Sequence, residues 1–167
     1  MKKAILVMDM QEIFVGENRA AIFKYDIEEL IMQVNHVIDN NNDNLVIYVR
    51  NLMKKNFINR FAPFQVYEGT RDAQLAAALH IVSDHIFDKY TGDAFSNLEL
   101  NTFLKQQKVE VLEMIGVDGG GCVALTGIGA CKAGYKVIIN TKAIGTVMKA
   151  KQKKYNKLLA ELGATFV

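Results

Sequence analysis

The chain has 167 residues, half of them hydrophobic, with one proline, twelve glycines and no tryptophan. This composition is typical of a compact globular protein, and we expect a single domain over residues 1–167. The formal net charge is only +2. Such a charge is too small to gather nucleic acid or to coat a membrane surface, so neither partner is expected.

The N-terminal segment carries two lysines but only five apolar residues before Asp9. It is too short for a signal peptide or a membrane span, so we expect a cytoplasmic protein. Cys122 and Cys131 are nine residues apart on one predicted helix and point to opposite sides of it. They cannot form a disulfide bond, and both are expected to be free thiols, as the cytoplasm requires.

Apolar runs rich in β-branched residues predict six strands, at Ala4–Met8, Leu45–Val49, His85–Phe87, Val109–Val117, Lys136–Ile139 and Ala164–Val167. A helical pattern follows each of the first five, beginning at Asp26, Thr70, Asn97, Cys122 and Lys149. Strands that are continuous apolar runs are buried on both faces. The sequence therefore predicts a Rossmann-like, three-layer α/β/α fold with a six-stranded, mainly parallel sheet.

One connection is unusually long for this kind of fold. The segment Lys54–Glu68 contains the only proline, Pro63, and four aromatic residues. Long loops in compact domains are often functional, so we interpret this one either as a lid or as an oligomer contact.

Three reactive side chains fall where the ligand site of an open parallel sheet is expected, beyond the carboxyl ends of the strands. Asp9 ends the first strand, Lys89 ends the third, and Cys122 opens the helix after the fourth. Each alone has an ordinary structural explanation, since a cysteine is often a small core residue and a charged residue often lies at the surface. Their coincidence on one rim favours a catalytic site.

The chemistry of that rim suits acyl transfer. The N-terminus of a helix and a nearby lysine both favour the thiolate form of Cys122. The glycines 119–121 allow positive φ and let a substrate carbonyl approach backbone N–H groups. Asp9 is the candidate general base, with Lys89 polarising the pair. Cys131, by contrast, is interpreted as a core residue.

Four blocks carry a family pattern along nearly the whole chain: Asp9–Phe14, Glu68–Thr70, Lys89 with Ala94, Phe95 and Leu98, and Gly116–Val117 with Cys122, Thr126, Ala130 and Gly134–Tyr135. These blocks resemble the isochorismatase-like cysteine hydrolases, a superfamily that includes nicotinamidases and N-carbamoylsarcosine amidohydrolases. Asp93, Lys142 and the glycines 119–121 depart from that pattern, which bears on the substrate more than on the fold.

The resemblance implies a catalytic triad of Asp9, Lys89 and Cys122. It also implies a cis peptide bond between Val117 and Asp118, and an oxyanion hole formed by the backbone N–H groups of Asp118 and Cys122. The residues expected to contact substrate are Phe14, Gln11, Phe95 and Gly121. Homodimers or homotetramers are expected by the same analogy.

No metal or other cofactor is expected. Nicotinamidases of this superfamily carry an Asp-x-His and a further histidine after the second strand, but this chain has Arg50-Asn-Leu-Met-Lys-Lys-Asn-Phe at that place. The three histidines, His36, His80 and His85, show no ligand spacing.

One geometric question stays open at this point. The superfamily's usual strand order, 3-2-1-4-5-6, separates Lys89 from Asp9 by two strand spacings, about 10 Å. Either the lysine reaches across the rim, or the third strand lies beside the first.

The leading hypothesis is a cysteine-dependent hydrolase that cleaves the C–N bond of a small amide or ureido substrate through a thioester. The alternative is a catalytically silent homologue that binds a small molecule or a protein. A nucleotide-binding protein is disfavoured, because no Gly-x-Gly-x-x-Gly follows the first strand. An α/β-hydrolase is disfavoured as well, because no histidine follows the nucleophile.

Overall fold

The computed structural model describes residues 1–167 and contains one six-stranded sheet. Its strands, all paired in parallel, are β1 (Lys3–Met8), β2 (Leu45–Asn51), β3 (Ile86–Lys89), β4 (Val111–Val117), β5 (Lys136–Gly145) and β6 (Thr165–Phe166). The strand order is β3-β2-β1-β4-β5-β6. The predicted six-stranded parallel architecture is confirmed, with the third strand at the edge beside β2.

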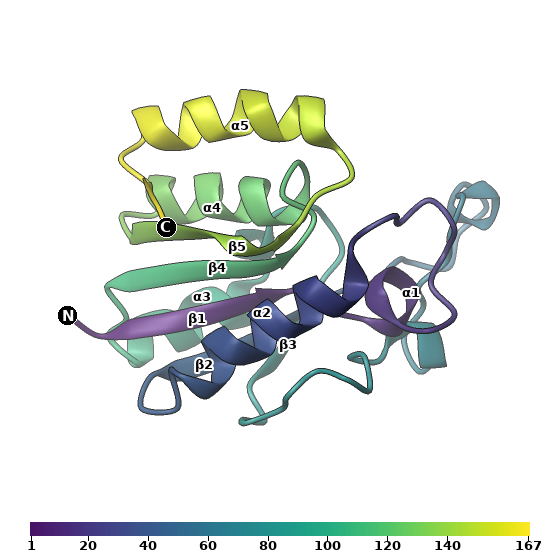
Figure 1. The fold of residues 1–167 in the computed structure, drawn as a ribbon, viewed down its shortest axis with the longest axis horizontal. Helices are drawn as coiled ribbons and strands as arrows, with labels where there is room; N and C mark the ends of the chain where they lie inside the picture. Colours follow the sequence, from purple (N-terminus) through teal and green to yellow (C-terminus); the bar gives the residue numbers. More distant parts are fainter.

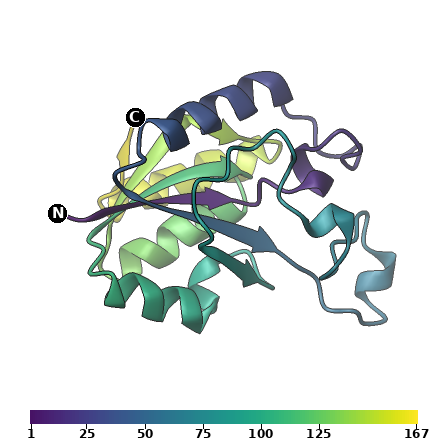
Figure 2. The same ribbon diagram turned by 90° about the horizontal axis from the view of Figure 1, so that it is seen from below.

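Helices cover both faces of this sheet and make the three layers (Figures 1 and 2). The five α-helices are α1 (Glu12–Val15), α2 (Ile27–Asp39), α3 (Leu98–Gln106), α4 (Cys122–Lys132) and α5 (Lys149–Glu161). Three short 3-10 turns, η1 (Asn59–Phe61), η2 (Arg71–Ala73) and η3 (Ala94–Ser96), lie in the connections. Helix α2 packs on one face, and α3 and α4 pack on the other with α5 against α4. None of the helices is long and apolar enough to cross a membrane.

The core is divided between the two faces by the alternation of side chains along the central strands. Ile5 and Val7 of β1 belong to the cluster under α2, whereas Leu6 and Met8 belong to the cluster under α3 and α4. All four side chains are fully buried. Because β1 is covered on both faces, the residue that follows its carboxyl end has a fixed position.

The helix expected from Thr70 does not form. Only the single 3-10 turn Arg71–Ala73 is present, and the following residues run antiparallel to the segment after β1. The Ala76 N–H donates to Met10 O at 2.9 Å, and the Glu12 N–H donates to Gln74 O at 2.9 Å. These tertiary hydrogen bonds replace the helical ones that the alanine-rich sequence favours.

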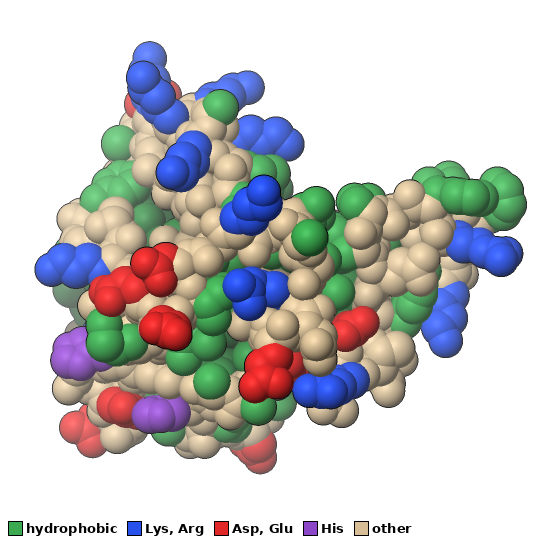
Figure 3. All heavy atoms as spheres, turned by 45° about the vertical axis from the view of Figure 1, so that its right-hand side comes forward, with side chains coloured by type: hydrophobic (Ala, Val, Ile, Leu, Met, Phe, Trp, Pro, Cys, Tyr) green, Lys and Arg blue, Asp and Glu red, His purple; other side chains and the backbone are tan.

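The long connection after β2 projects from the body of the molecule. Its most exposed apolar side chains are Phe57, Ile58 and Phe61, and hydrophobic side chains gather at the tip of the projection in Figure 3. Phe64, in the same segment, turns inward and packs edge-on against Phe14, with ring centroids 5.6 Å apart. Val66 is fully buried in the same core cluster. The segment therefore anchors itself to the interior through Phe64 and Val66 and exposes the apolar side chains at its tip.

Candidate active site

The carboxyl ends of β1 and β3 and the start of α4 bring Asp9, Lys89 and Cys122 together. Asp9 follows the last residue of β1 directly and adopts φ +53°, a left-handed conformation uncommon for a residue other than glycine. Its N–H donates to Val49 O at 2.8 Å, which fixes the turn. The carboxyl group is buried as a result.

Lys89 reaches across β2 to join the other two residues. Its Nζ lies 2.9 Å from Asp9 Oδ2, 3.0 Å from Asn51 Oδ1 and 3.1 Å from Cys122 Sγ. An ammonium group has three protons, so each has an acceptor here, as a side chain that is 0% exposed requires. The open question of strand order is thereby answered: β3 is not beside β1, and the length of the lysine side chain closes the gap.

The surroundings of the Cys122 thiol favour its protonated form. Burial, followed by the charge of Asp9, raises the pKa of Cys122 to about 12, and the ammonium of Lys89 offsets only part of this. Lys89 thus favours the thiolate, as expected, but burial and the charge of Asp9 outweigh its effect. The thiol must lose its proton to a base when it reacts.

Asp9 has a free acceptor for that proton. Its Oδ1 is the only buried side-chain oxygen or nitrogen without a hydrogen-bond partner. Burial raises the pKa of Asp9, while Lys89 acts in the opposite direction. Burial alone would lower the pKa of Lys89, but Asp9 and Cys122 together raise it, so the lysine keeps its charge.

Two backbone N–H groups beside the thiol are available to bind an oxygen atom. The Val117–Asp118 peptide bond is cis, where the resemblance implied one. The N–H groups of Asp118 and Cys122 donate to no acceptor within the protein. Asp118 follows the last residue of β4, and Cys122 is the first residue of α4, where N–H groups have no partner in a preceding turn. They are the pair named for the oxyanion hole.

The side chain of Asp118 fastens the loop that carries these donors. Its Oδ1 accepts the Gly120 N–H at 2.7 Å, and its Oδ2 accepts the Val147 N–H at 2.6 Å and the Tyr25 hydroxyl at 3.1 Å. Burial, together with the charge of Asp118, raises the pKa of Tyr25 above its ordinary value, so the phenol stays a donor.

The glycines before Cys122 provide space, and Gly121 also has an unusual backbone conformation, with φ -135° and ψ -114°. None of glycines 119, 120 and 121 has positive φ, contrary to the expectation. A Cβ at Gly119 would overlap Thr146, and one at Gly120 or Gly121 would overlap Met148. The small residues let the 146–148 segment lie directly against the loop.

A cavity of about 310 Å³ opens onto Asp9, Asn51, Asp118 and Cys122. This volume is at the lower end of the range for small-molecule sites. Its apolar wall is formed by Phe14, Ile22, Phe23, Phe64, Val147 and Met148. The site can therefore enclose a small, largely apolar molecule beside the thiol.

Of the four residues expected to contact substrate, only Phe14 lines this cavity. Gln11 is fully buried, and its amide bonds the backbone of Asn51 and Ala73 instead. Phe95 lies on the opposite face of the sheet, against Tyr135. Gly121 precedes the helix and leaves room for Met148, which is one of the residues that line the cavity.

Sequence reasoning missed Asn51, Tyr25 and Met148. Asn51 could have been found, because it ends β2 next to Lys89 in the register of the sheet. Tyr25 and Met148 lie outside the strand ends, and no spacing signal marks them.

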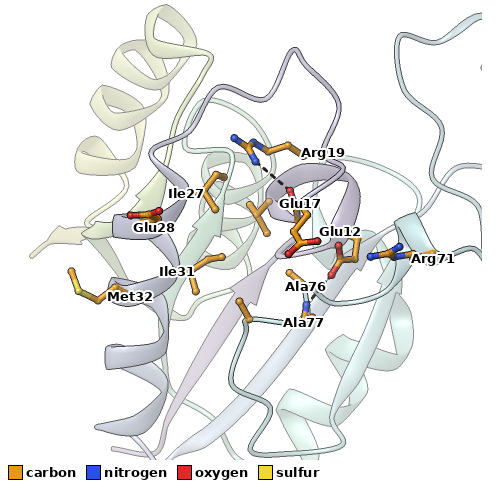
Figure 4. Close-up of a pocket in the computed structure, with 13 residues that line it drawn as sticks. Glu12, Glu17, Arg19, Ile27, Glu28, Ile31, Met32, Arg71, Ala76 and Ala77 are labelled. Carbon is orange, nitrogen blue, oxygen red and sulfur yellow. Dashed lines mark hydrogen bonds between the residues drawn. The ribbon is translucent and has the colours of Figure 1, made fainter.

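A larger cavity, of about 590 Å³, lies on the outside of the molecule between α1, α2 and the segment after η2 (Figure 4). Glu12 borders it and accepts the Ala77 N–H at 2.8 Å. None of Asp9, Lys89 and Cys122 lines this cavity, so it is separate from the reactive side chains.

The sequence of the chain matches a known family of α/β domains. A model of the isochorismatase domain matches residues 3–167. The chain therefore belongs to the isochorismatase family. A comparison of the sequence with curated proteins finds no match.

Solved structures with the same fold come from several organisms. An isochorismatase-like hydrolase from Alkaliphilus metalliredigens superposes with a TM-score of 0.84 at 22% identity, covering 100% of this chain and 95% of that one. The pyrazinamidase of Pyrococcus horikoshii, in complex with zinc, gives 0.86 at 20% identity, covering 100% and 99%. N-carbamoylsarcosine amidase from Thermoplasma acidophilum gives 0.82 at 21% identity, covering 99% and 95%. At these identities the likeness establishes the fold.

The residues of this chain do not fit a zinc ion at the end of β2. Asn51, Leu52 and Met53 stand where nicotinamidases have Asp-x-His. The Asn51 side-chain oxygen already accepts a hydrogen bond from Lys89. No group of three histidine, cysteine, aspartate or glutamate side chains comes close enough anywhere in the chain to hold a metal ion. We derive no chemical step through a metal.

Proposed function

We propose that this protein is a cysteine hydrolase that cleaves the C–N bond of a small amide or ureido compound through a thioester. The observation that carries the proposal is the contact of one buried ammonium, Lys89, with both Asp9 and Cys122. A thiol, a carboxylate with a free oxygen and two unpaired N–H groups then surround one small cavity. These are the groups that nucleophilic acyl transfer requires, which supports the proposal.

In the first half of the reaction, Asp9 Oδ1 takes the thiol proton as Cys122 Sγ bonds to the carbonyl carbon. The negative charge that develops on the carbonyl oxygen is bound by the N–H groups of Asp118 and Cys122. The tetrahedral intermediate collapses, its C–N bond breaks, and the leaving amine takes the proton from Asp9. A thioester on Cys122 remains.

In the second half, Asp9 takes a proton from water as the water oxygen attacks the thioester carbon. The C–S bond breaks, the acid product leaves, and the sulfur recovers the proton held by Asp9. Lys89 stays protonated throughout, stabilises the carboxylate and screens the charge on sulfur. Because the free thiol has a raised pKa, attack and proton transfer are expected to be concerted.

Hydrolysis of a panel of small amides and ureido compounds by the parent, Cys122→Ala and Cys131→Ala proteins tests this proposal. We expect turnover by the parent, a loss of at least about 1,000-fold in kcat for Cys122→Ala, and no change for Cys131→Ala. Cys131 is the matched control, because it is the other free cysteine of the same helix. Full activity of Cys122→Ala would reject the mechanism. A parent protein that binds compounds of the panel without hydrolysing them would favour a silent binding homologue.

A further inference from the structure

Asn51 is held in one orientation at the edge of the cavity. A lysine ammonium can only donate, so the Asn51 atom 3.0 Å from Lys89 Nζ has to be the carboxamide oxygen. The backbone of Asn51 is held as well, since its N–H donates to Gln11 Oε1 at 2.7 Å and its carbonyl accepts from Gln11 Nε2 at 3.1 Å. The side-chain amide therefore cannot flip without breaking its hydrogen bond with the buried ammonium of Lys89.

The nitrogen of this amide has no partner in the protein. Asn51 lines the cavity, and its Nδ2 takes part in no hydrogen bond. The only buried unpaired side-chain atom of the chain is Asp9 Oδ1, so Nδ2 is accessible from outside. With the oxygen directed at Lys89, the two N–H bonds of Nδ2 are a fixed donor at the cavity wall.

The charged side chains around the cavity limit which substrate groups can bind next to Asn51 Nδ2. The ionisable side chains that line it are Asp9, Asp118, the phenol of Tyr25 and the thiol of Cys122, and no lysine, arginine or histidine lines it. All three protons of the nearest cation, Lys89, are already engaged. A carboxylate on the substrate would therefore enter an apolar site next to two acidic side chains and gain no counter-ion.

We infer that Asn51 is a substrate-binding residue that selects uncharged amides whose acyl group carries a hydrogen-bond acceptor. This inference rests on the proposed function and specifies its substrate class. The scissile carbonyl lies at the N–H groups of Asp118 and Cys122, the amide nitrogen lies toward Asp9, and the acceptor of the acyl group lies on Asn51 Nδ2. The aromatic and aliphatic wall encloses the remainder of a flat acyl group.

The test compares substrates of equal shape on parent and Asn51→Leu proteins. Benzamide is matched with the three pyridine carboxamides, in which one ring C–H is replaced by an acceptor nitrogen, and with 3-carboxybenzamide, which adds a charge. We expect the parent to prefer at least one pyridine carboxamide over benzamide by about tenfold in kcat/KM. In Asn51→Leu this ratio should fall to about one, and 3-carboxybenzamide should be the poorest substrate of both proteins.

The ratio separates substrate recognition from a structural role. Asn51→Leu also removes an acceptor of Lys89, which should lower kcat/KM for all substrates alike. This common loss cancels in the ratio of two substrates. Asn51→Asp keeps an oxygen for Lys89 and removes the donor, while adding a negative charge that acts on all the neutral substrates alike. It should therefore lose the preference too, and it replaces Asn51→Leu should that variant not fold. Asn44→Leu should keep it, because Asn44 lies at the opposite end of β2 from Asn51 and its side chain bonds Asn41.

A preference that survives in both Asn51 variants, or a parent that favours 3-carboxybenzamide, would overturn the inference and leave the thioester mechanism standing. Turnover unaffected by Cys122→Ala would reject the mechanism instead. A parent protein that hydrolyses other amides but none of these neutral aryl amides would overturn the inference alone.

Discussion

Lys89 Nζ lies 2.9 Å from Asp9 Oδ2 although β2 separates the strands that carry the two residues. Both side chains are almost completely buried. Two opposite charges out of water stabilise each other only while both are present, and removing one leaves the other unpaired. The same ion pair is therefore expected to affect both the stability of the fold and the proposed chemistry of the site.

Replacing the lysine alone should therefore destabilise the protein. We expect Lys89→Met to lower the free energy of unfolding by about 3–5 kcal/mol, because Asp9 is left as an unpaired buried carboxylate. The double variant Asp9→Asn/Lys89→Met removes both charges and should recover most of the loss. Urea denaturation followed by circular dichroism measures both. If the double variant is as unstable as the single one, the charge pair is not the cause.

The reactivity of Cys122 should depend on pH in a way that reflects its burial. In a Cys131→Ser background, the rate of alkylation by iodoacetamide should keep rising well beyond pH 9, toward the raised pKa of about 12. The rate is followed by mass spectrometry on intact protein. A plateau already reached near pH 7 would show that the free thiol is ionised, contrary to the structure.

The same pKa predicts a change in stability with pH. The pKa of Cys122 is raised in the folded protein above its ordinary value of 9.0, so its contribution to stability is present below pH 9 and is lost as the pH rises toward 12. Parent and Cys122→Ser proteins should therefore diverge above pH 9, with the parent losing more stability. Parallel melting temperatures across that range would contradict the assignment.

The loop that holds the two unpaired N–H groups depends on Asp118. Asp118→Ala leaves the donors of Gly120, Val147 and Tyr25 without their acceptor. We expect kcat to fall by about 100-fold with a smaller change in KM, because the misplaced N–H groups act on the transition state. Steady-state kinetics on a hydrolysed amide measures this loss.

Tyr25→Phe is the control for that variant. It removes one of the three donors and leaves the two backbone contacts of Asp118, so its cost should be about 1 kcal/mol in stability with little loss of kcat. Equal loss of kcat in both variants would mean that the tyrosine, not the loop, carries the effect.

Replacing Gly116 tests how closely β4 approaches the backbone of β1 next to the site. It has φ +103°, and a Cβ there would overlap the backbone of Met8, next to Asp9. We expect Gly116→Ala to cost about 1–3 kcal/mol more than Gly134→Ala, which has φ +91° but no atom within 4 Å of the added carbon. Thermal unfolding of the two variants compares them, and equal costs would exclude the overlap.

The strand pattern and the three reactive residues were predictable because each depends on local information. A continuous apolar run such as Ala4–Met8 predicts a buried strand, and the rule that ligands bind at strand ends selects Asp9, Lys89 and Cys122. The parallel sheet is confirmed, and the structure brings these three side chains together.

The errors arise where distant segments decide the outcome. The helix predicted from Thr70 gives way to hydrogen bonds with the segment after β1, which no local propensity reports. Gln11 was assigned to substrate, but it holds Asn51, which is 40 residues away along the chain. The ionisation of Cys122 depends on its burial next to Asp9. Its position at a helix N-terminus therefore did not predict the direction in which its pKa is shifted.

If Cys122 is the nucleophile, the acyl group of the substrate is bound to its sulfur during turnover. Intact-mass spectrometry of protein quenched in acid during turnover of a neutral amide detects this intermediate. We expect a covalent adduct with the mass of the acyl group, located on the peptide that contains Cys122 and removed by hydroxylamine. Steady turnover with no adduct on that peptide, and with undiminished rate in Cys122→Ala, would contradict this role of Cys122.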